Sequence, residues 1–263
     1  MSFRVPLESL FEIGIFETLK VSDGRVLSLD KHLERLVASG RSASPSFHVA
    51  SEQVRRELLE AIEKEGIKEA YVRFTLIPVG RGKTFSFTLV RPPRKIRSSF
   101  IRRGVSIETT ATRRNHLPAL SGELKVREFQ NGLLAVLEGL DRRDIFERIY
   151  LDRQGYVCEG TITNLFIIKR NELTTPPSFL GALSGVTRSL VLALGRREGL
   201  EARERPFTRF ELYTAEEVFL TNTSLGILPV TKVDGRSVAD GKVGPWTKKL
   251  REIYHKESVR SDG

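Results

Sequence analysis

Residues 151–169 read LDRQGYVCEGTITNLFIIK, and this stretch predicts a β-hairpin followed directly by another strand. A glycine-containing turn separates two apolar runs there, which is typical of a hairpin. The expected elements are a strand over 149–152, a turn over 153–155 and strands over 156–159 and 163–169. The hairpin ends on a carboxylate, Glu159, which directly precedes the turn-forming Gly160.

The sequence on both sides of this hairpin predicts a mixture of strands and helices. Before it, apolar alternation predicts strands over 13–19, 26–29, 70–78, 84–90 and 105–109. Helical spacing predicts a helix capped by Asp30 or Ser28, a second helix capped by Ser51 and ended by Gly66, and a third over 127–140. After it, we expect a helix from Gly185 to about Gly199, a strand over 218–221 and a final helix from Pro245 through Tyr254. The fold class is therefore α/β (α+β), with antiparallel pairing in the first half because its turns are short.

The composition is that of a globular protein with a basic excess. The chain has 263 residues, 40% hydrophobic and 29% charged, and a formal net charge of +10. This excludes collagens, disulfide scaffolds and disordered chains. The stretch 91–103, RPPRKIRSSFIRR, holds six basic groups and no acidic one. We interpret it as a linker between a small domain over 1–90 and a larger one over 104–263.

Several features favour a cytoplasmic protein. A single cysteine, Cys158, excludes an intramolecular disulfide. No apolar run approaches the roughly 20 residues of a membrane-spanning helix. Glu8 and Glu12 stand where a signal peptide would need an apolar core. The four histidines are scattered without a cysteine partner, so no metal site is expected.

The positive charge is compatible with nucleic acid, an acidic membrane surface or anionic small molecules. Nucleic-acid binding is disfavoured, because the basic stretch contains one aromatic residue, Phe100, and no helix-turn-helix or RNP-type pattern occurs. The plain alternative for this stretch is a solvated interdomain connection.

Three places could bind an anion. Residues 185–188, Gly-Val-Thr-Arg, open an amphipathic helix, whose free N–H groups and dipole attract negative charge. Residues 221–224, Thr-Asn-Thr-Ser, follow a buried-type strand, and Arg73 lies within an apolar strand. Taken singly, each place has a plain structural explanation: residues 185–188 as a helix start, residues 221–224 as a polar turn, and Arg73 as part of an exposed strand face. Together, the three places would form a phosphate-binding site, Lys125 would supply an amine and Glu159 would supply a carboxylate.

The order of these motifs along the chain resembles the fold-type IV pyridoxal-phosphate enzymes. That family contains branched-chain aminotransferases, D-amino-acid aminotransferases and 4-amino-4-deoxychorismate lyases. The matching stretches are GIFETLKVSDGR with its HLERL helix, YVRFTL, GELK, LDRQGYVCEGTITNLFIIK, LTTPP, LSGVTR, EVFLTNTSLGILPV and GPWTKKL. The resemblance implies a small N-terminal α+β domain, a larger mixed-sheet, barrel-like domain, an active site between them and a homodimer.

The resemblance also implies a role for each candidate site residue. Lys125 would form the Schiff base with pyridoxal 5'-phosphate and then move a proton between the substrate Cα and the cofactor C4′ carbon. Glu159 would keep the pyridine nitrogen protonated. The remaining cofactor-binding residues would be Arg73, Val186, Thr187 and Thr223 around the phosphate, with Asn164 and Asn222 beside them. After the lysine, relatives often carry an Asn that partners the cofactor's phenolate oxygen; this chain departs from that pattern over 126–131, and Gln130 could substitute for it.

The choice of reaction depends on residues 222–229, Asn-Thr-Ser-Leu-Gly-Ile-Leu-Pro. Their pattern and the short chain resemble the lyases, so we expect a 4-amino-4-deoxychorismate lyase that makes 4-aminobenzoate and pyruvate in the folate pathway. The alternative is a transaminase for branched-chain L-amino acids or D-amino acids with 2-oxoglutarate. A basic nucleic-acid-binding module is the remote alternative. In each enzymatic reading the substrate is a small anionic amine.

In the family that the chain resembles, the interdomain connection runs near the mouth of the cleft, so residues 91–103 should attract anionic substrate and cofactor. Neutralising Arg94, Lys95 and Arg97 is expected to lower kcat/KM much more at low salt than at high salt, because salt screens the attraction. Steady-state kinetics at two ionic strengths measure this. Equal losses at both would identify the three residues as part of a plain solvated linker.

Overall fold

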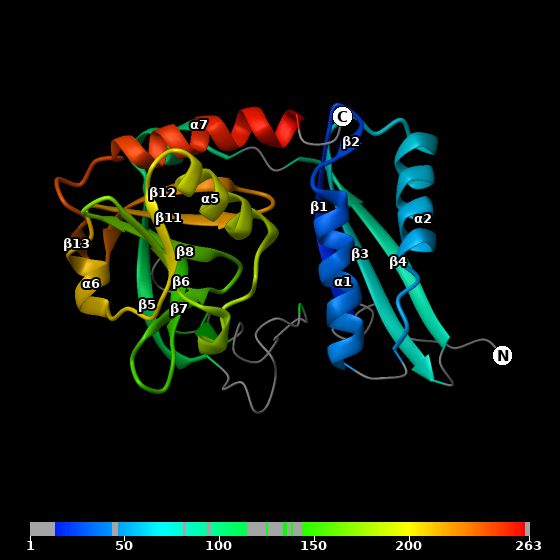
Figure 1. Cartoon of the computed structure of the whole chain (residues 1–263), viewed down its shortest axis with the longest axis horizontal. Helices are drawn as coiled ribbons and strands as arrows, with labels where there is room; N and C mark the ends of the chain where they lie inside the picture. The colour runs from blue at the N-terminus through cyan, green and yellow to red at the C-terminus, as the bar shows by residue number, and fades with distance from the viewer. Residues whose placement is uncertain are drawn as a thin grey trace. The chain divides into compact units, whose positions relative to one another are not determined.

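The computed structural model describes residues 14–43, 47–80, 83–93, 96–114, 125, 134–135, 138 and 144–260. Contacts along the chain divide it into two compact units (Figure 1). The smaller unit comprises Met1–Arg94, Leu124–Phe129 and Val259–Gly263, and the larger unit comprises Lys95–Glu123 and Gln130–Ser258.

The smaller unit contains a four-stranded antiparallel sheet in the order β2-β1-β3-β4. Its strands are β1 (Ile15–Ser22), β2 (Arg25–Val26), β3 (Ala70–Gly80) and β4 (Lys83–Arg91). Because side chains alternate between the two faces of a strand, Ile15 and Leu19 of β1 share one face with Phe74 of β3, and all three are buried. Phe16 and Arg73 belong to the opposite face. The alternation therefore assigns one face to a core and leaves the other for polar groups.

Two helices, α1 (Leu29–Ala43) and α2 (Ser51–Lys64), complete this core. Leu33 and Leu36 of α1 are buried as the helical spacing predicts. The predicted strand over 26–29 is wrong beyond Val26, because the chain turns at Ser28, with φ of 55°, and α1 begins at the next residue. The predicted cap at Ser51 is also wrong: the N-cap is Ala50, and no side chain caps the helix.

A buried charged cluster joins β1 to α1. Glu17 of β1 accepts hydrogen bonds from Arg35 at 2.7 and 2.6 Å, and one of its oxygens lies 2.7 Å from His32 Nδ1. Glu17 and His32 are each only 2% exposed. Burial alone would raise the pKa of Glu17, but the charge and hydrogen bonds of Arg35, together with His32, outweigh it and lower that pKa to about 2.

The larger unit is built on a mixed nine-stranded sheet. Its strand order is β10-β9-β8-β11-β12-β5-β6-β7, with β13 paired to β12. The pairs β10/β9, β12/β5 and β5/β6 are parallel, and the other pairs are antiparallel. The strands are β5 (Val105–Arg113), β6 (Ile145–Leu151), β7 (Val157–Gly160), β8 (Asn164–Lys169), β9 (Glu172–Thr175), β10 (Glu201–Glu204), β11 (Glu217–Asn222), β12 (Gly226–Val233) and β13 (Arg236–Ser237). The expected mixture of helices and strands is confirmed.

Both faces of this sheet are covered by apolar cores. The helical elements are α3 (Ser98–Arg103), the short 3-10 helix η2 (Ser178–Leu180), α5 (Val186–Arg197), α6 (Arg209–Tyr213) and α7 (Pro245–Arg260). On one face, the rings of Phe166 and Phe219 stack at 5.0 Å and pack with Val191 of α5 and Leu250 of α7. On the other face, strand residues such as Leu165 form a core with elements that include α6. The strands that carry the candidate site are therefore held from both sides.

The basic stretch 91–103 is partly ordered into secondary structure. Arg91 ends β4, and the last six residues form α3. Phe100 of α3 packs edge-on against Phe146, with ring centroids 5.6 Å apart. Its apolar side chain thus joins this part of the stretch to the core of the larger unit. The predicted helix over 127–140 lies almost entirely outside the described residues.

Helix α7 is anchored at its first turn by an acidic side chain. Glu217, at the start of β11, accepts hydrogen bonds from the backbone N–H groups of Trp246 and Thr247 at 2.9 and 2.7 Å, and from the Thr247 hydroxyl at 2.6 Å. A Cβ added at Gly244 would lie 2.1 Å from the Glu217 carboxyl carbon, so only glycine allows this approach. The carboxylate satisfies N–H groups that a helix start otherwise leaves without partners.

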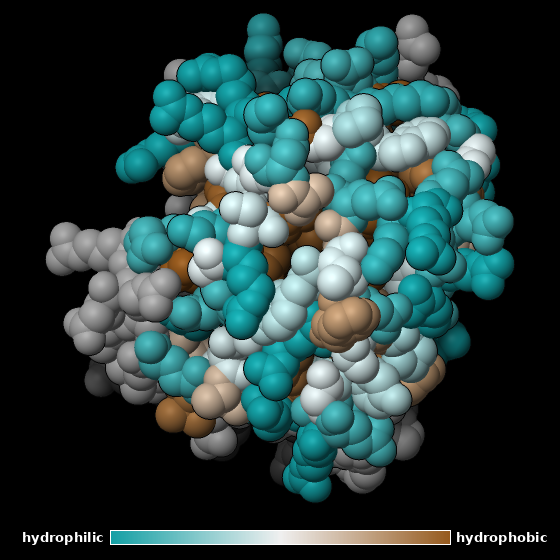
Figure 2. All heavy atoms as spheres, turned by 90° about the vertical axis from the view of Figure 1, so that its left-hand side faces the viewer, coloured by the Kyte–Doolittle hydropathy of each residue, from teal (hydrophilic) through white to brown (hydrophobic). Residues whose placement is uncertain are grey.

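In the described part of the chain, no helix is both long and apolar enough to cross a membrane. The coloured part of the face in Figure 2 is mostly hydrophilic, and its apolar side chains are scattered among polar ones. Isolated apolar residues of this kind are normal on protein surfaces.

The buried Glu17 cluster predicts how stability depends on pH. The folded pKa of Glu17, about 2, lies below the ordinary value of 4.5, so its contribution is complete above pH 4.5 and is lost as the pH falls toward 2. Replacing Glu17 with Gln should lower the free energy of unfolding by about 3 kcal/mol at pH 7, and this deficit should shrink between pH 4.5 and 2. Urea unfolding at several pH values measures it.

The matched control is Glu34→Gln, on the exposed side of α1, which should change stability by less than about 0.5 kcal/mol at every pH. A deficit for Glu17→Gln that does not vary with pH would contradict the assignment.

Candidate functional site

A buried carboxylate in the larger unit connects four segments of the chain. Glu159, near the end of β7, is 6% exposed. Its Oε2 accepts hydrogen bonds from Asn164 Nδ2 at 3.0 Å and from the backbone N–H of Leu183 at 2.8 Å. Its Oε1 lies 2.9 Å from a guanidinium nitrogen of Arg114. The carboxylate is therefore held in one orientation by three donors, of which Arg114 and Leu183 are distant from it in sequence.

Arg114 follows β5 and is a site residue that the sequence analysis missed. Besides pairing with Glu159, it donates from Nε to the carbonyl of Gly181 at 2.8 Å. The negative charge of Glu159 is thus balanced inside the protein, as a buried charge requires. Nothing in the sequence distinguishes Arg114 from the chain's many other arginines.

Asn164, the first residue of β8, fixes the segment that leads into α5. Its Nδ2 donates both to Glu159 and to the carbonyl of Leu183, the latter at 2.8 Å. A Cβ added at Gly185 would lie 2.2 Å from Asn164 Oδ1, so the backbone at Gly185 passes directly over the amide. The glycine at this position is required by that close approach. The structure therefore brings together three residues that the sequence predicted as site residues or neighbours.

The loop after Glu159 is shaped by a second buried carboxylate, Glu147 of β6. It accepts hydrogen bonds from the Thr161 hydroxyl at 2.6 Å, the Thr161 backbone N–H at 3.2 Å and the Thr163 hydroxyl at 3.1 Å. Burial raises the pKa of Glu147, although these hydrogen bonds act in the opposite direction. The loop therefore has a defined course between Glu159 and Asn164.

The first turn of α5 presents the predicted anion-binding groups. Gly185 is the N-cap residue in an extended conformation, and no side chain caps the helix. Val186 and Thr187 are buried in its first turn. Arg188 does not join them, because its guanidinium binds the carbonyl of Pro176 at 2.9 Å and Glu204 at 2.7 Å. The N–H groups of a helix start, together with the Thr187 hydroxyl, suit a phosphate.

The turn between β11 and β12 lies beside the loop that follows Glu159. The Asn222 side chain donates to the carbonyl of Ile162 at 3.1 Å and accepts from the backbone N–H of Leu225 at 2.7 Å. These two bonds shape the turn that carries the half-buried Thr223. Asn222 therefore supports the turn through its side chain, and its role toward a ligand stays a prediction.

A buried hydroxyl at the end of β11 fits a site that accepts a polar group. Thr221 is 0% exposed, and its Oγ1 has no hydrogen-bond partner among the described residues. Thr221 is the direct strand partner of Asn164 in the β8/β11 pair. A buried hydroxyl without a partner carries a desolvation cost. An acceptor group such as a phosphate oxygen, or a water molecule beside it, would remove that cost.

In the smaller unit, the two predicted cations share one aromatic ring. The guanidinium of Arg73 lies 3.8 Å from the centroid of the Phe16 ring, and Lys125 Nζ lies 5.2 Å from it. The backbone N–H of Phe16 donates to the carbonyl of Lys125 at 3.2 Å. The structure thus brings Lys125 and Arg73 together at β1, on the sheet face opposite the helices. Gln130 lies outside the described residues.

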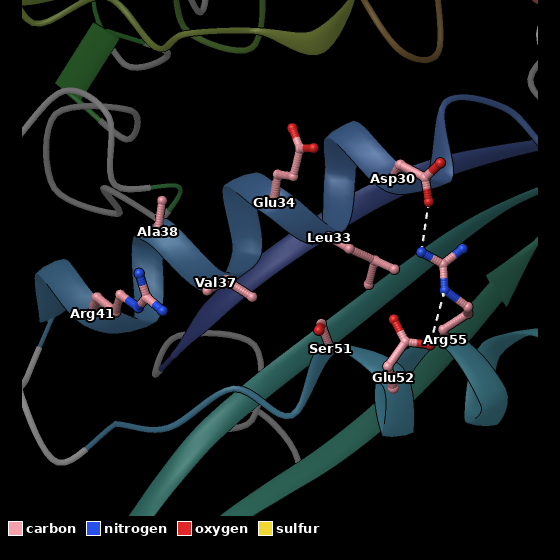
Figure 3. Close-up of a pocket in the computed structure, with 9 residues that line it drawn as sticks. All are labelled: Asp30, Leu33, Glu34, Val37, Ala38, Arg41, Ser51, Glu52 and Arg55. Atoms are coloured by element: carbon pink, nitrogen blue, oxygen red, sulfur yellow. Dashed lines mark hydrogen bonds and ion pairs between the residues drawn. The ribbon is translucent and has the colours of Figure 1, made fainter.

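A separate surface cavity of the smaller unit contains none of the predicted site residues. It has a volume of about 490 Å³ and lies between α1 and the start of α2. Figure 3 shows that Arg55 projects between Asp30 and Glu52 at one end of it. Its lining mixes charged and apolar side chains, and Asp30, Glu52 and Arg55 already pair with each other.

Comparison with known proteins identifies relatives of this chain. The family described as amino-transferase class IV matches residues 14–233. The Aquifex aeolicus protein named probable branched-chain-amino-acid aminotransferase is 34% identical over 245 residues, which cover 87% of this chain and 76% of that protein. The D-alanine aminotransferase of Bacillus licheniformis is 26% identical over 257 residues, with coverages of 92% and 86%.

The fold agrees with a solved structure as well. The Escherichia coli branched-chain amino acid aminotransferase superimposes with a TM-score of 0.82 at 29% identity, covering 93% of this chain and 85% of that one. The fold expected from the sequence resemblance is thereby confirmed. The relatives' names agree better with the transaminase alternative than with the lyase that residues 222–229 suggested.

The close approach of Gly185 to Asn164 predicts a coupled pair of substitutions. Gly185→Ala should lower the free energy of unfolding by about 1–3 kcal/mol, because its Cβ would overlap the Asn164 amide. In an Asn164→Ala background, where the overlapping atom is absent, the same substitution should cost less than half as much. Denaturant unfolding of the four proteins measures this coupling. Equal costs in both backgrounds would contradict the arrangement.

Proposed function

Because the chain belongs to the class IV aminotransferase family, we propose that it is a transaminase that uses pyridoxal 5'-phosphate and acts on amino acids. The observation that carries this proposal is the fixed orientation of Glu159 by Arg114, Asn164 and the Leu183 N–H. A carboxylate held in this way is suited to pair with a protonated ring nitrogen.

The residues of the larger unit fit the phosphate and the ring of this cofactor. When bound, pyridoxal phosphate supplies an electron sink that stabilises negative charge at the substrate Cα. Glu159 would hold the proton on the pyridine nitrogen. In the larger unit, the phosphate would be held by the Val186 N–H with the Thr187 hydroxyl and by Thr223. Arg73, which the sequence resemblance also assigns to the phosphate, belongs to the smaller unit. The Thr221 hydroxyl, which has no partner among the described residues, and the close passage of Gly185 support this fit.

Lys125 would provide the amine that attaches to the cofactor and then moves the proton at the substrate Cα. Its position beside Arg73 at the Phe16 ring supports this role, because a phosphate-binding cation and the reacting amine would then belong to one cluster. The ring of Phe16 offers both cations an apolar, electron-rich surface.

The names of the relatives support the proposed substrate class. Branched-chain aminotransferases and a D-alanine aminotransferase are among them, which supports transamination of an amino acid over cleavage of 4-amino-4-deoxychorismate. We therefore favour branched-chain L-amino acids with 2-oxoglutarate, and D-amino acids come second. A homodimer is part of the same proposal, and analytical ultracentrifugation would test it.

Product analysis with two substrate sets tests this function. Protein supplied with pyridoxal phosphate should convert leucine, isoleucine or valine with 2-oxoglutarate into the branched-chain 2-oxo acid and glutamate. It should produce no 4-aminobenzoate or pyruvate from aminodeoxychorismate. Chromatography of both mixtures measures the products. Release of 4-aminobenzoate without 2-oxo acid exchange would contradict the proposal, and exchange of D-amino acids alone would favour the second substrate class.

Substitution of the lysine tests the site. Lys125→Ala should abolish transamination and the covalent attachment of the cofactor that borohydride reduction makes permanent. Lys169→Ala is the matched control, because Lys169 lies at the end of β8 and its side chain donates to the Thr214 hydroxyl, away from the predicted site residues. Mass spectrometry of the reduced proteins locates the cofactor. Reduced cofactor on another lysine of the wild-type protein would overturn the assignment of Lys125.

A further inference from the structure

Tyr254 of the C-terminal helix contacts both elements of the larger unit that the proposed function assigns to the phosphate. Its hydroxyl oxygen lies 3.5 Å from Thr187 Oγ1, in the first turn of α5. Its ring lies against Gly226, at the end of the β11/β12 turn: a Cβ added there would be 3.0 Å from Tyr254 Cε1. One side chain of α7, the red helix in Figure 1, therefore touches the helix start and the turn at once.

The backbone around Tyr254 is built to admit this ring. Gly226 has φ of +62°, a left-handed conformation that favours glycine, and the missing side chain leaves the space that the tyrosine ring fills. Helix α7 is fixed at its other end by Glu217, and Trp246 and Ile253 pack on the same core as α5. Tyr254 is therefore delivered to Thr187 by a helix that is anchored along its length.

We propose that Tyr254 positions the Thr187 hydroxyl for phosphate binding by donating a hydrogen bond to Thr187 Oγ1. A threonine hydroxyl has one proton to donate and two lone pairs to accept with. A phosphate offers only acceptors at this point, so the Thr187 proton must point to the phosphate. The tyrosine must then be the donor in the Tyr254–Thr187 contact, and the chain of donors runs from Tyr254 through Thr187 to the phosphate oxygen.

The surroundings of Tyr254 favour that direction. Burial raises its pKa above the ordinary value of 10, so the phenol keeps its proton at neutral pH and has one to donate. A hydrogen bond to Thr187 also restricts the rotation of the threonine hydroxyl before the ligand binds. Less ordering is then required on binding, which raises affinity without a direct contact to the ligand.

This inference rests on the proposed function, since it assumes that α5 and the β11/β12 turn hold a phosphate. The test therefore compares pyridoxal phosphate with pyridoxal, which lacks the phosphate. Four proteins are needed: wild type, Tyr254→Phe, Thr187→Val and the double variant. Tyr254→Phe keeps the ring against Gly226 and removes only the hydroxyl, so the packing is retained. Titration of the cofactor-free proteins, followed by visible absorbance, measures both affinities.

Tyr254→Phe should weaken pyridoxal phosphate binding roughly three- to tenfold, which is the effect of one hydrogen bond, and should leave pyridoxal binding unchanged. In the Thr187→Val background it should have no further effect, because the hydroxyl that it positions is absent. Tyr213→Phe, which removes a hydroxyl bonded to Asp234 at 2.6 Å, is the matched control and should not alter either affinity.

The outcomes separate this inference from the proposed function. Unchanged pyridoxal phosphate affinity in Tyr254→Phe, equal losses for both ligands, or full additivity with Thr187→Val would each overturn the role of Tyr254. If the wild-type protein binds neither ligand, the proposed function itself fails. If Tyr254→Phe does not fold, as judged by circular dichroism, two other measurements decide the question. One is the phosphate-specific loss of affinity expected for Thr187→Val. The other is the exchange rate of the Tyr254 hydroxyl proton, measured with and without inorganic phosphate.

Discussion

The buried carboxylate of Glu159 is the constraint around which the larger unit is arranged. A negative charge can be buried only where donors and an opposite charge surround it. Here those partners come from the end of β5, the start of β8 and the segment before α5. Satisfying one charge thus aligns three pieces of chain that are far apart in sequence. The helix start after Leu183 acquires its place as a consequence, while Glu147 and Asn222 shape the neighbouring loop and turn.

Much of the fold follows from local pattern. The alternation of apolar residues in β1 and β3 and the helical spacing in α1 and α5 specify which face is buried, and these elements, like β4, were predicted to within a few residues. The misplaced end of the strand at Val26 has a local cause, because Ser28 adopts a left-handed backbone that its residue type does not announce. Helix α3 was missed because its arginines mask Phe100, the residue of the helix that packs against the core together with the preceding Ile96.

The candidate site was predictable only in part. Motif order pointed to Lys125, Glu159 and the helix start at Gly185, because each stands in a recognisable run of residues. Arg114, Glu147 and Tyr254 have no such signal: their roles arise from pairings across 45, 14 and 67 positions of the chain. Such contacts depend on how strands are ordered in a mixed sheet, and spacing along the sequence does not reveal that order.

The Glu17 cluster restricts which amino-acid substitutions the protein can accept during evolution. Removing Glu17 leaves the buried His32 and Arg35 without their shared partner, and removing His32 or Arg35 takes away one donor of the buried carboxylate, so each single change is unfavourable. Replacing the whole set by well-packed apolar residues can be neutral, because no isolated charge then remains. Each single substitution therefore lowers the stability of the protein, whereas replacing all three residues together need not. The three positions should therefore vary as a group among related sequences, and libraries for protein engineering should randomise them together.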